Sequence, residues 1–486
     1  MRMRLVIAAC TALLTGCTVG PDYRRPDIAV PAGWRLSITE AAEISNVVWW
    51  DQFGDPVLSQ QVRTALANNL DLKIATANVE QAYAQYGITR SQLFPQVNAD
   101  ASAARQKQFL PPPFESAPFN TFSLDLSASY ELDLWGRLRR ATEAARASVL
   151  ASEEGRRTVV MTLVSSVANA YIQLRALDQQ LDIARRTVAS RREVLHLQQL
   201  RFEEGVVPES DYRQAESQFR SAAAQLIDLE RLIARQENLI SGLLGENPHA
   251  VARGRSLDEL AFPAVPAALP SSLLERRPDV RQAEQNLIAA NADIGVARGA
   301  YFPSISLTGL FGVESTDLSN MFNGSSRVWS FGGALTQPIF NAGRIRNQVA
   351  QAEAFQRQML YEYQRSIISA FEDVNDPLVA RANFSGARAE QAANVEALRR
   401  FRDLAAVRYK EGVTIYLEIA SAEDQLFNAE LALTATQSQL FQSYASLYRS
   451  MGGGWVWTAQ SLGNPPPDAI PVKEPSADRS EPRPGG

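Results

Sequence analysis

Apolar and polar residues alternate strictly between residues 122 and 134. The apolar positions are Phe122, Leu124, Leu126, Ala128, Tyr130, Leu132 and Leu134, and Ser, Asp or Glu stands at each position between them. A period of two predicts a β-strand with one apolar and one polar face. This pattern is typical of the wall of a membrane barrel, with lipid outside and water inside, although the edge of a soluble β-sandwich would also show it.

Weaker alternation predicts three more strands. One lies at about 96–106, one begins at 304–308, and the last places Trp329, Phe331 and Leu335 on one parity. Loops rich in turn-forming residues separate the two strands of each pair. The sequence therefore predicts two β-hairpins, at about 96–134 and about 304–340.

A helical period follows each hairpin. Apolar residues recur at spacings of three and four from Val160 to Val188, as in the seam of a packed helix pair. Residues 137–204 contain no Pro, so a single helix on the order of 100 Å long is expected at about 1.5 Å per residue. The pattern predicts long helical hairpins at about 137–244 and about 344–451. Pro377 lies inside the second, where we predict a local bend because an interior Pro removes a helical hydrogen bond.

The two halves of the chain repeat each other at an offset of about 207 residues. Phe94-Pro95 is matched by Phe302-Pro303, and the turn at 201–206 is matched by the turn at 408–413. Such self-similarity indicates a duplicated structural unit.

Each repeat is expected to begin with a helix, at about 57–93 and about 279–301, that ends at Phe-Pro because Pro disfavours the helical conformation in the residue before it. The domain prediction is a first repeat at 57–270, which closes with a linker, and a second at 271–452.

The first 16 residues have the features of an export signal. Arg2 and Arg4 precede an apolar stretch at 5–14, and Leu14-Thr15-Gly16-Cys17 follows. Small residues directly before a Cys indicate a lipoprotein signal, which would make an acylated Cys17 the first residue of the mature chain. An ordinary signal peptide with an incidental Cys is the alternative. This covalent lipid is the only added group that we expect.

The two ends of the mature chain have different compositions from the repeats. Residues 17–56 are Pro-rich, and we predict a lipidated segment that lies extended on the surface and carries the aromatic residues Trp34, Trp49, Trp50 and Phe53. Residues 453–486 are rich in Pro, Asp and Ser, which predicts a largely disordered tail.

Charge and motif content argue against two other classes of protein. The net charge of −5 argues against a nucleic-acid partner, which would require a basic face. The two histidines, His196 and His249, are far apart, and no metalloprotease, phosphate-loop or serine-nucleophile motif is present. We therefore predict neither catalysis nor a metal site.

Four strands are too few to cross a membrane alone. Lipid leaves the backbone groups of a sheet edge unsatisfied, so only closed barrels span a bilayer as strands. Two copies of the chain would give eight strands, a width that side chains fill, whereas three would give twelve and leave an aqueous lumen. A transport role therefore predicts a homotrimer, and a dimer would indicate a plugged anchor.

Several segments resemble the outer membrane factor family of TolC-like efflux channels, and within it the lipoprotein branch of OprM and NodT. They are 49–56, 130–137, 276–280, 337–344 and the paired Arg-aromatic-x-x-Gly turns. The resemblance covers nearly the whole mature chain. It implies a mainly α fold, in which tandem-duplicated long antiparallel helices form a tunnel and four strands per chain contribute to a twelve-stranded trimeric β-barrel.

The resemblance also implies a function and its partners. The expected protein is a passive, gated conduit that exports drugs or other toxic small molecules. It would be lipid-anchored and barrel-spanning in the outer membrane, in contact with outer-membrane lipids, with a long periplasmic helical domain. It would dock onto a periplasmic membrane-fusion adaptor and an inner-membrane transporter of the resistance-nodulation-division (RND) type. A channel for type I secretion and a structural envelope spacer or adhesin are the alternatives.

The family's gate lies at the helix turns, and three positions of this chain match it. Asp211 lies six residues after Gly205, Glu418 lies six after Gly412, and Tyr409 lies three before Gly412. In a trimer the carboxylates would ring a constriction and attract cations, while Tyr409 would help to lock neighbouring coils. The alternative is that the acids only stabilise helix N-termini. At Thr414 the chain departs from TolC-type relatives, which carry a basic locking residue there.

Overall fold

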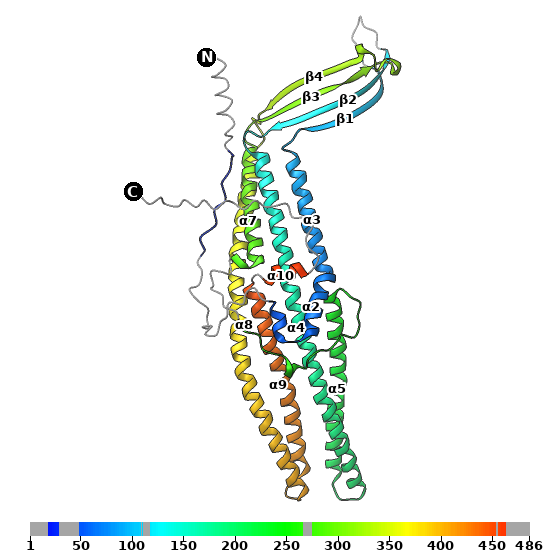
Figure 1. Cartoon of the computed structure of the whole chain (residues 1–486), viewed down its shortest axis with the longest axis vertical. Coiled ribbons are helices and arrows are strands. Elements are labelled where there is room, and N and C mark those ends of the chain that lie inside the picture. The colour runs from blue at the N-terminus through cyan, green and yellow to red at the C-terminus, as the bar shows by residue number, and fades with distance from the viewer. Residues whose placement is uncertain are drawn as a thin grey trace, which may run out of the picture.

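The computed structural model describes residues 18–28, 48–107, 109, 117–265, 275–452 and 455–462. The molecule is elongated, with a β-sheet at one end and the turns of two helical hairpins at the other (Figure 1). The predicted export signal, Cys17, Trp34 and residues 463–486 of the predicted tail lie outside the described residues. Within the described ranges, no helix combines the length and the apolar character that crossing a membrane requires.

Four antiparallel strands form one sheet in the order β1 (Gln96–Lys107), β2 (Pro118–Leu132), β3 (Ser304–Ser315) and β4 (Arg327–Thr336). Each repeat contributes one hairpin, and β2 pairs with β3 to join the two. Strand β3 continues to Ser315, well beyond the clear alternation in the sequence. The edges of the sheet are therefore β1 and β4.

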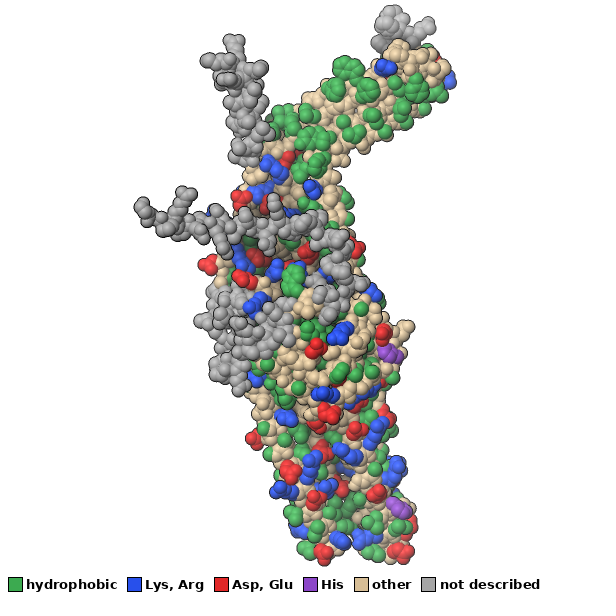
Figure 2. Space-filling view, viewed as in Figure 1, with side chains coloured by type: hydrophobic (Ala, Val, Ile, Leu, Met, Phe, Trp, Pro, Cys, Tyr) green, Lys and Arg blue, Asp and Glu red, His purple; other side chains and the backbone are tan. Residues whose placement is uncertain are grey.

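The two faces of the sheet differ in polarity. The register places Leu126, Phe311 and Trp329 side by side on one face, where all three are more than half exposed. On the other face Asp100 lies opposite Asp125, and its carboxylate accepts a hydrogen bond from Ser127 at 3.0 Å. The described residues form no core beneath either face, and the sheet projects from the helices with hydrophobic side chains in view (Figure 2).

Eight α-helices are described. They are α2 (Pro56–Asn68), α3 (Leu70–Ser91), α4 (Arg137–Glu203), α5 (Glu209–Leu244), α7 (Pro278–Gly299), α8 (Arg344–Lys410), α9 (Tyr416–Met451) and α10 (Trp455–Leu462). Single 3-10 turns, η1 (Trp49–Phe53), η2 (Leu257–Glu259), η3 (Leu318–Asn320) and η4 (Gly324–Ser326), complete the elements. Helices α4 and α8 each run for 67 residues, as the long helical periods predict.

Helices α4 and α8 run through both layers of the molecule. Near the sheet, contacts run in the order α3, α4, α7 and α8. Toward the turns, α5 packs on α4, α4 on α9, and α9 on α8. The start of α4 is fixed by Asp133, whose carboxylate accepts hydrogen bonds from the backbone N–H groups of Leu138 and Arg139 at 3.0 and 2.9 Å.

The predicted first helix at 57–93 is wrong in one respect, because it is two helices that meet at Asn69. The Asn69 side chain accepts a hydrogen bond from the Leu72 N–H at 3.0 Å and donates one to the Leu243 carbonyl at 2.9 Å. Asn is a favoured N-cap residue because its side-chain oxygen satisfies a free N–H of the first turn. The chain therefore restarts its helix at Leu70.

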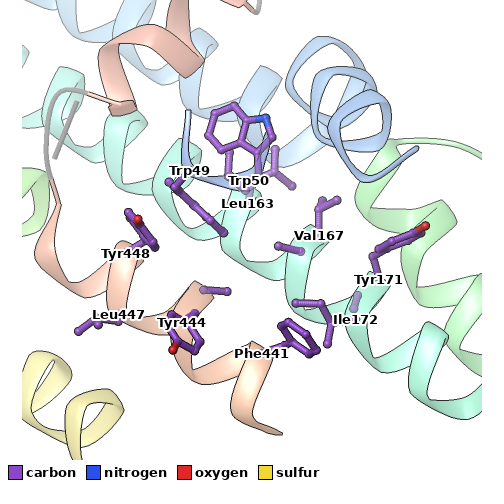
Figure 3. Packing of buried hydrophobic residues seen from close by; sticks show 14 of the residues in the cluster. Trp49, Trp50, Leu163, Val167, Tyr171, Ile172, Phe441, Tyr444, Leu447 and Tyr448 are labelled. Atoms are coloured by element: carbon purple, nitrogen blue, oxygen red, sulfur yellow. The ribbon is translucent and has the colours of Figure 1, made fainter. Parts of the chain in front are cut away.

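The predicted surface location of the aromatic cluster is also wrong. Trp49, Trp50 and Phe53 are fully buried in η1. Trp49 stacks on Tyr448 with ring centroids 5.4 Å apart (Figure 3). Trp49 also meets Trp455 edge-on, with ring centroids 5.9 Å apart. Aromatic rings bury large apolar areas, so this cluster contributes strongly to the core. We use the name belt for the region where η1, α2 and α10 meet the middle of α4 and the C-terminal part of α9.

The predicted disorder of 453–486 is wrong for residues 455–462, which form α10. Trp455 is fully buried in the belt, and Arg157 lies over the Trp457 ring at 3.6 Å. The predicted bend at Pro377 does not interrupt α8, which stays helical on both sides of this buried residue and curves along its length (Figure 1).

The prediction of an extended path holds for residues 18–28. Val19 donates a backbone hydrogen bond to Trp135 at 3.0 Å. Asp22 pairs with Arg140 of α4 at 2.6 Å, and Arg25 pairs with Glu284 of α7 at 3.0 Å. This segment therefore ties the first repeat to the second just below the sheet.

Candidate functional site at the helix tips

The two turns that end the helical hairpins have the same geometry. Gly205 and Gly412 have φ values of +69° and +73°, which favour glycine. Val206 donates its N–H to the Arg201 carbonyl at 2.7 Å, and Val413 donates to Arg408 at 2.8 Å. This six-to-one bond defines a Schellman ending, which explains why the Arg-aromatic-x-x-Gly pattern occurs in both repeats.

Tyr409 connects the two hairpins at the tip. Its half-buried hydroxyl, on α8, accepts hydrogen bonds from Gln198 Nε2 and Arg201 Nη1 of α4, both at 3.0 Å. The Arg201 guanidinium also lies 5.6 Å from the Tyr409 ring centroid. The sequence singled out Tyr409 but neither of its partners, because hairpin pairing is not visible in local patterns.

Glu418 is held within its own hairpin. Its carboxylate pairs with Arg408 at 2.9 Å and accepts a hydrogen bond from the Thr414 hydroxyl. Thr414 therefore helps to hold the acid. Arg408 partly offsets the negative charge that Glu418 would present to a pore.

Asp211 lies in the first turn of α5 and has weaker contacts. Its backbone N–H donates to the Pro208 carbonyl at 3.1 Å, and its carboxylate accepts a bond from the Ser210 hydroxyl at 3.3 Å. Within the part of the chain that the structure describes, no hydrogen bond or ion pair joins Asp211 to Tyr409 or Glu418. The three predicted residues lie at the same end of the molecule but have separate partners.

A buried polar cluster above the tip was not predicted. Arg191 of α4, only 3% exposed, pairs with Asp424 of α9 at 2.5 Å and donates to the Gln218 carbonyl of α5 at 2.9 Å. Gln218 in turn donates to the Ala420 carbonyl at 2.9 Å. The cluster therefore joins three helices from both repeats. Gln218 has a counterpart in the second repeat, Gln425, but this match in the sequence does not indicate that Gln218 bonds to Arg191 and Ala420.

Glu423 lies beside this cluster with one carboxylate oxygen, Oε2, buried and without a hydrogen-bond partner among the described residues. Burial raises the pKa of the Glu423 carboxyl, while the charges of Arg191 and Arg402 lower it and Asp424 raises it. Glu423 and Arg186 both line a cavity of about 370 Å³ between α4, α8 and α9. The region between the hairpins is therefore polar and incompletely packed.

A sequence model of the family "Outer membrane efflux protein" matches residues 62–246 and 269–453. The chain belongs to this family. Each of the two matches covers most of one repeat, in agreement with the duplication seen in the fold. This family consists of channel proteins, so the arrangement at the tips belongs to a channel.

Curated relatives and a solved structure are similar over nearly their whole length. The toluene efflux pump outer membrane protein TtgC of Pseudomonas putida is 36% identical over 461 residues, which are 93% of this chain and 95% of TtgC. The cation efflux system protein CusC of Escherichia coli is 35% identical over 452 residues, or 92% and 98% of the two chains. The open state of the Neisseria gonorrhoeae MtrE outer membrane channel superposes with a TM-score of 0.80 at 31% identity, over 90% and 99%.

These likenesses confirm the predicted family, the mainly α fold with a four-stranded sheet, and the predicted function. The efflux family member described here is an outer-membrane channel component of an efflux pump.

Proposed function

We propose that three copies of this chain assemble into a lipid-anchored tunnel that is closed at the helix tips. It would open when a periplasmic membrane-fusion adaptor and an inner-membrane RND-type transporter engage it. The observation that carries this proposal is that the two lateral edges of the chain, helices α3 and α8, expose apolar side chains. In a ring of copies, each edge would be covered by the opposite edge of the next copy.

The two edges expose matching kinds of surface. Helix α3 has an exposed apolar stripe at Leu70, Ile74 and Ile88, and helix α8 exposes Phe355 and Ile368. Each of these side chains is at least 46% exposed, so both edges of a single copy present apolar surface to water. One edge of a copy can therefore pack on the opposite edge of the next, the head-to-tail contact that generates rings.

The sheet supports the same arrangement. Strands β1 and β4 are its edges, and a bilayer does not tolerate free backbone groups at an edge. Three sheets would close into a twelve-stranded barrel, with the face of Phe311 and Trp329 toward lipid and the face of Asp100 and Asp125 toward water. The apolar face would then contact outer-membrane lipids.

An acyl group on Cys17 fits this orientation. Thr18, the next residue, packs on Gly136 at the junction between sheet and helices, where a Cβ on Gly136 would come within 2.8 Å of it. A lipid on Cys17 would therefore start at the level where the barrel ends and the helices begin. Cys17→Ser is expected to abolish labelling with radioactive palmitate; continued labelling would refute the anchor.

Reconstitution of the full mature protein into planar bilayers tests the channel, with native mass spectrometry of the same sample. A trimeric mass and stepwise ion conductance are expected. A stable single copy without conductance would overturn the proposal and favour a structural spacer.

The acids of the tip would set ion selectivity. Asp211→Asn combined with Glu418→Gln is expected to reduce the preference for cations, because the constriction would lose two carboxylates per chain. The reversal potential in a salt gradient measures this preference. Glu390→Gln, an exposed acid of α8 away from the turns, is the matched control and should leave the potential unchanged. An unaltered potential in the double variant would remove both acids from the constriction.

The transported compounds would be selected elsewhere in the pump. Relatives at similar identity are named for toluene and for cation efflux, so this level of similarity does not distinguish substrates. We expect deletion of the gene to sensitise cells only when the cognate transporter is present. Sensitisation without that transporter would indicate a general envelope defect.

A further inference from the structure

A small cavity lies in the belt between α2, α3, α4 and α10. Its volume is about 160 Å³. Apolar walls come from Leu66, Leu72, Val160 and Ala459, each from a different helix. A cavity of about 150 Å³ with such walls is large enough to hold one benzene ring.

One wall of this cavity is a buried cation. Arg156 of α4 is 6% exposed and lines the cavity. Among the described residues it has neither a hydrogen bond nor an ion pair. The other three buried arginines among the described residues have carboxylate partners: Arg140 pairs with Asp22, Arg191 with Asp424 and Arg277 with Asp373. Arg156 is therefore the exception that needs an explanation.

Neighbouring carboxylates are already engaged. Glu154 pairs with Arg157 at 2.5 Å, and Glu153 accepts a hydrogen bond from the Tyr83 hydroxyl at 2.5 Å. Burial lowers the pKa of the Arg156 guanidinium, the nearby charge of Arg157 lowers it further, and the charge of Glu153 raises it by less, so the pKa stays below its ordinary value. A guanidinium stays charged in a protein even so, and a buried charge without a partner is costly.

We propose that this cavity binds a small organic anion, a single carboxylate on an apolar body about the size of one aromatic ring, with the carboxylate on Arg156. A carboxylate can accept two parallel hydrogen bonds from a guanidinium fork, which compensates the charge as well as the donors. The apolar walls would cover the ring. Water alone could accept the hydrogen bonds but would bring no negative charge beyond that of Glu153, which already bonds to Tyr83.

The remaining charged residues of the cavity make the site selective for anions. Lys73 and Glu80 of α3 also line it, so with Arg156 the lining carries two positive charges and one negative charge. Glu80 is exposed and has no ion pair among the described residues. It is the one carboxylate of the lining that could rotate inward and compete with a bound anion.

Equilibrium dialysis of labelled benzoate against the full-length protein in detergent tests this site, with protein-free micelles as the blank. Saturable binding of one benzoate per chain is expected, at least tenfold tighter than that of benzamide, which has the same shape without the charge. Arg156→Gln should weaken binding at least tenfold, and Arg156→Lys, which keeps the charge but loses the fork, should weaken it less. Arg146→Gln, an exposed arginine of the same helix, is the matched control and should bind as the natural chain does.

Glu80→Gln should bind benzoate at least as tightly as the natural chain. Three results would overturn the proposal: no saturable binding, equal binding of benzoate and benzamide, or binding seen only after Glu80→Gln, which would mean that Glu80 fills the site itself. If Arg156→Gln does not fold, the comparison of benzoate with benzamide and the Arg156→Lys variant still decide the question.

Discussion

The belt and the helix tips are held together by different kinds of contact. In the belt Trp49, Phe441, Tyr448 and Trp455 are at most 1% exposed and belong to one buried cluster, in which Phe53 links the Trp49 and Phe441 rings. Figure 3 shows Trp49, Phe441 and Tyr448 in this cluster. At the tips the buried apolar residues form two small clusters, of Ala215, Tyr416 and Ala420 and of Ala405, Ile419 and Ala422. Polar bonds of Tyr409 and Arg191 also join the hairpins there.

This difference separates a fixed region from a region that can change shape. Aromatic burial is lost only when the rings are exposed to water, so the belt resists small displacements. A hydrogen bond contributes about 1 kcal/mol net, because water can replace its partner. Tips joined by a few such bonds can therefore separate at low cost while the belt holds the long helices in place. A gate at the tips requires this combination.

The largest expected effect is the loss of an aromatic ring from the belt. Trp49→Ala should lower the free energy of unfolding by about 3–5 kcal/mol, since it leaves a cavity at the centre of the cluster. Thermal unfolding of the detergent-solubilised protein measures it. The control is Trp457→Ala, which changes a Trp of α10 in the same belt. Trp457 is 51% exposed, so its loss should have a much smaller effect. An equal loss of stability in both variants would mean that the buried rings do not stabilise the belt more than an exposed ring does.

The second effect is expected at the junction above the tips. Arg191→Gln removes the ion pair with Asp424 and the bond to Gln218, and should cost about 2 kcal/mol, a figure reduced because the Asp424 side chain is 46% exposed. Hydrogen exchange should speed up around 215–225 and 418–427 while the belt stays protected. Arg185→Gln, whose ion pairs are both 3.9 Å long, should change neither region. Faster exchange in the belt would show that the two regions are coupled.

Much of this fold could be predicted because its signals are local. Periods of two and of three to four residues identify the strands and the two 67-residue helices. The positive φ at Gly205 and Gly412 explains why a Gly-containing turn recurs in both repeats. Local patterns failed at Asn69, whose side chain caps α3 and divides a segment that reads as one helix. They also failed at α10, whose burial depends on rings hundreds of residues away.

The candidate site could be predicted only in part, for the same reason. Position relative to the two glycines was enough to single out Asp211, Glu418 and Tyr409. The partners Gln198 and Arg201, and the pairing of Arg191 with Asp424, depend on how the hairpins of the two repeats pack against each other. Such contacts join residues more than 200 positions apart and leave no periodic signal in one sequence.

A smaller effect is expected at the tip itself. Tyr409→Phe removes the hydroxyl that accepts bonds from Gln198 and Arg201, and should favour the separated tips by about 1 kcal/mol, roughly fivefold in the ratio of open to closed. The open probability of single channels in planar bilayers measures this ratio. Tyr361→Phe, an exposed tyrosine of the same helix, should leave it unchanged. An unchanged open probability for Tyr409→Phe would mean that the closed tips are held by contacts between copies.

The smallest effect should depend on pH and concerns Glu423. Burial raises the pKa of its carboxyl above the ordinary value of 4.5, against the opposing charges of Arg191 and Arg402. A raised pKa means that the folded protein holds the proton more tightly than the unfolded chain. The resulting stabilisation is fully present below pH 4.5 and is lost as the pH rises through the folded pKa. Glu423→Gln cannot ionise, so it should be more stable than the natural chain at pH 8 and equal to it at pH 4, as measured by melting temperature.

The control for this experiment is Glu390→Gln, whose melting temperature should differ from that of the natural chain by the same amount at both pH values. If Glu423→Gln is instead less stable at pH 8, the ion pairs with Arg191 and Arg402 outweigh the cost of burial. The hairpins would then be held together by charge as firmly as the belt is by its rings. In that case opening would require neutralising or hydrating Glu423, because the loss of a few hydrogen bonds at Tyr409 would not be enough.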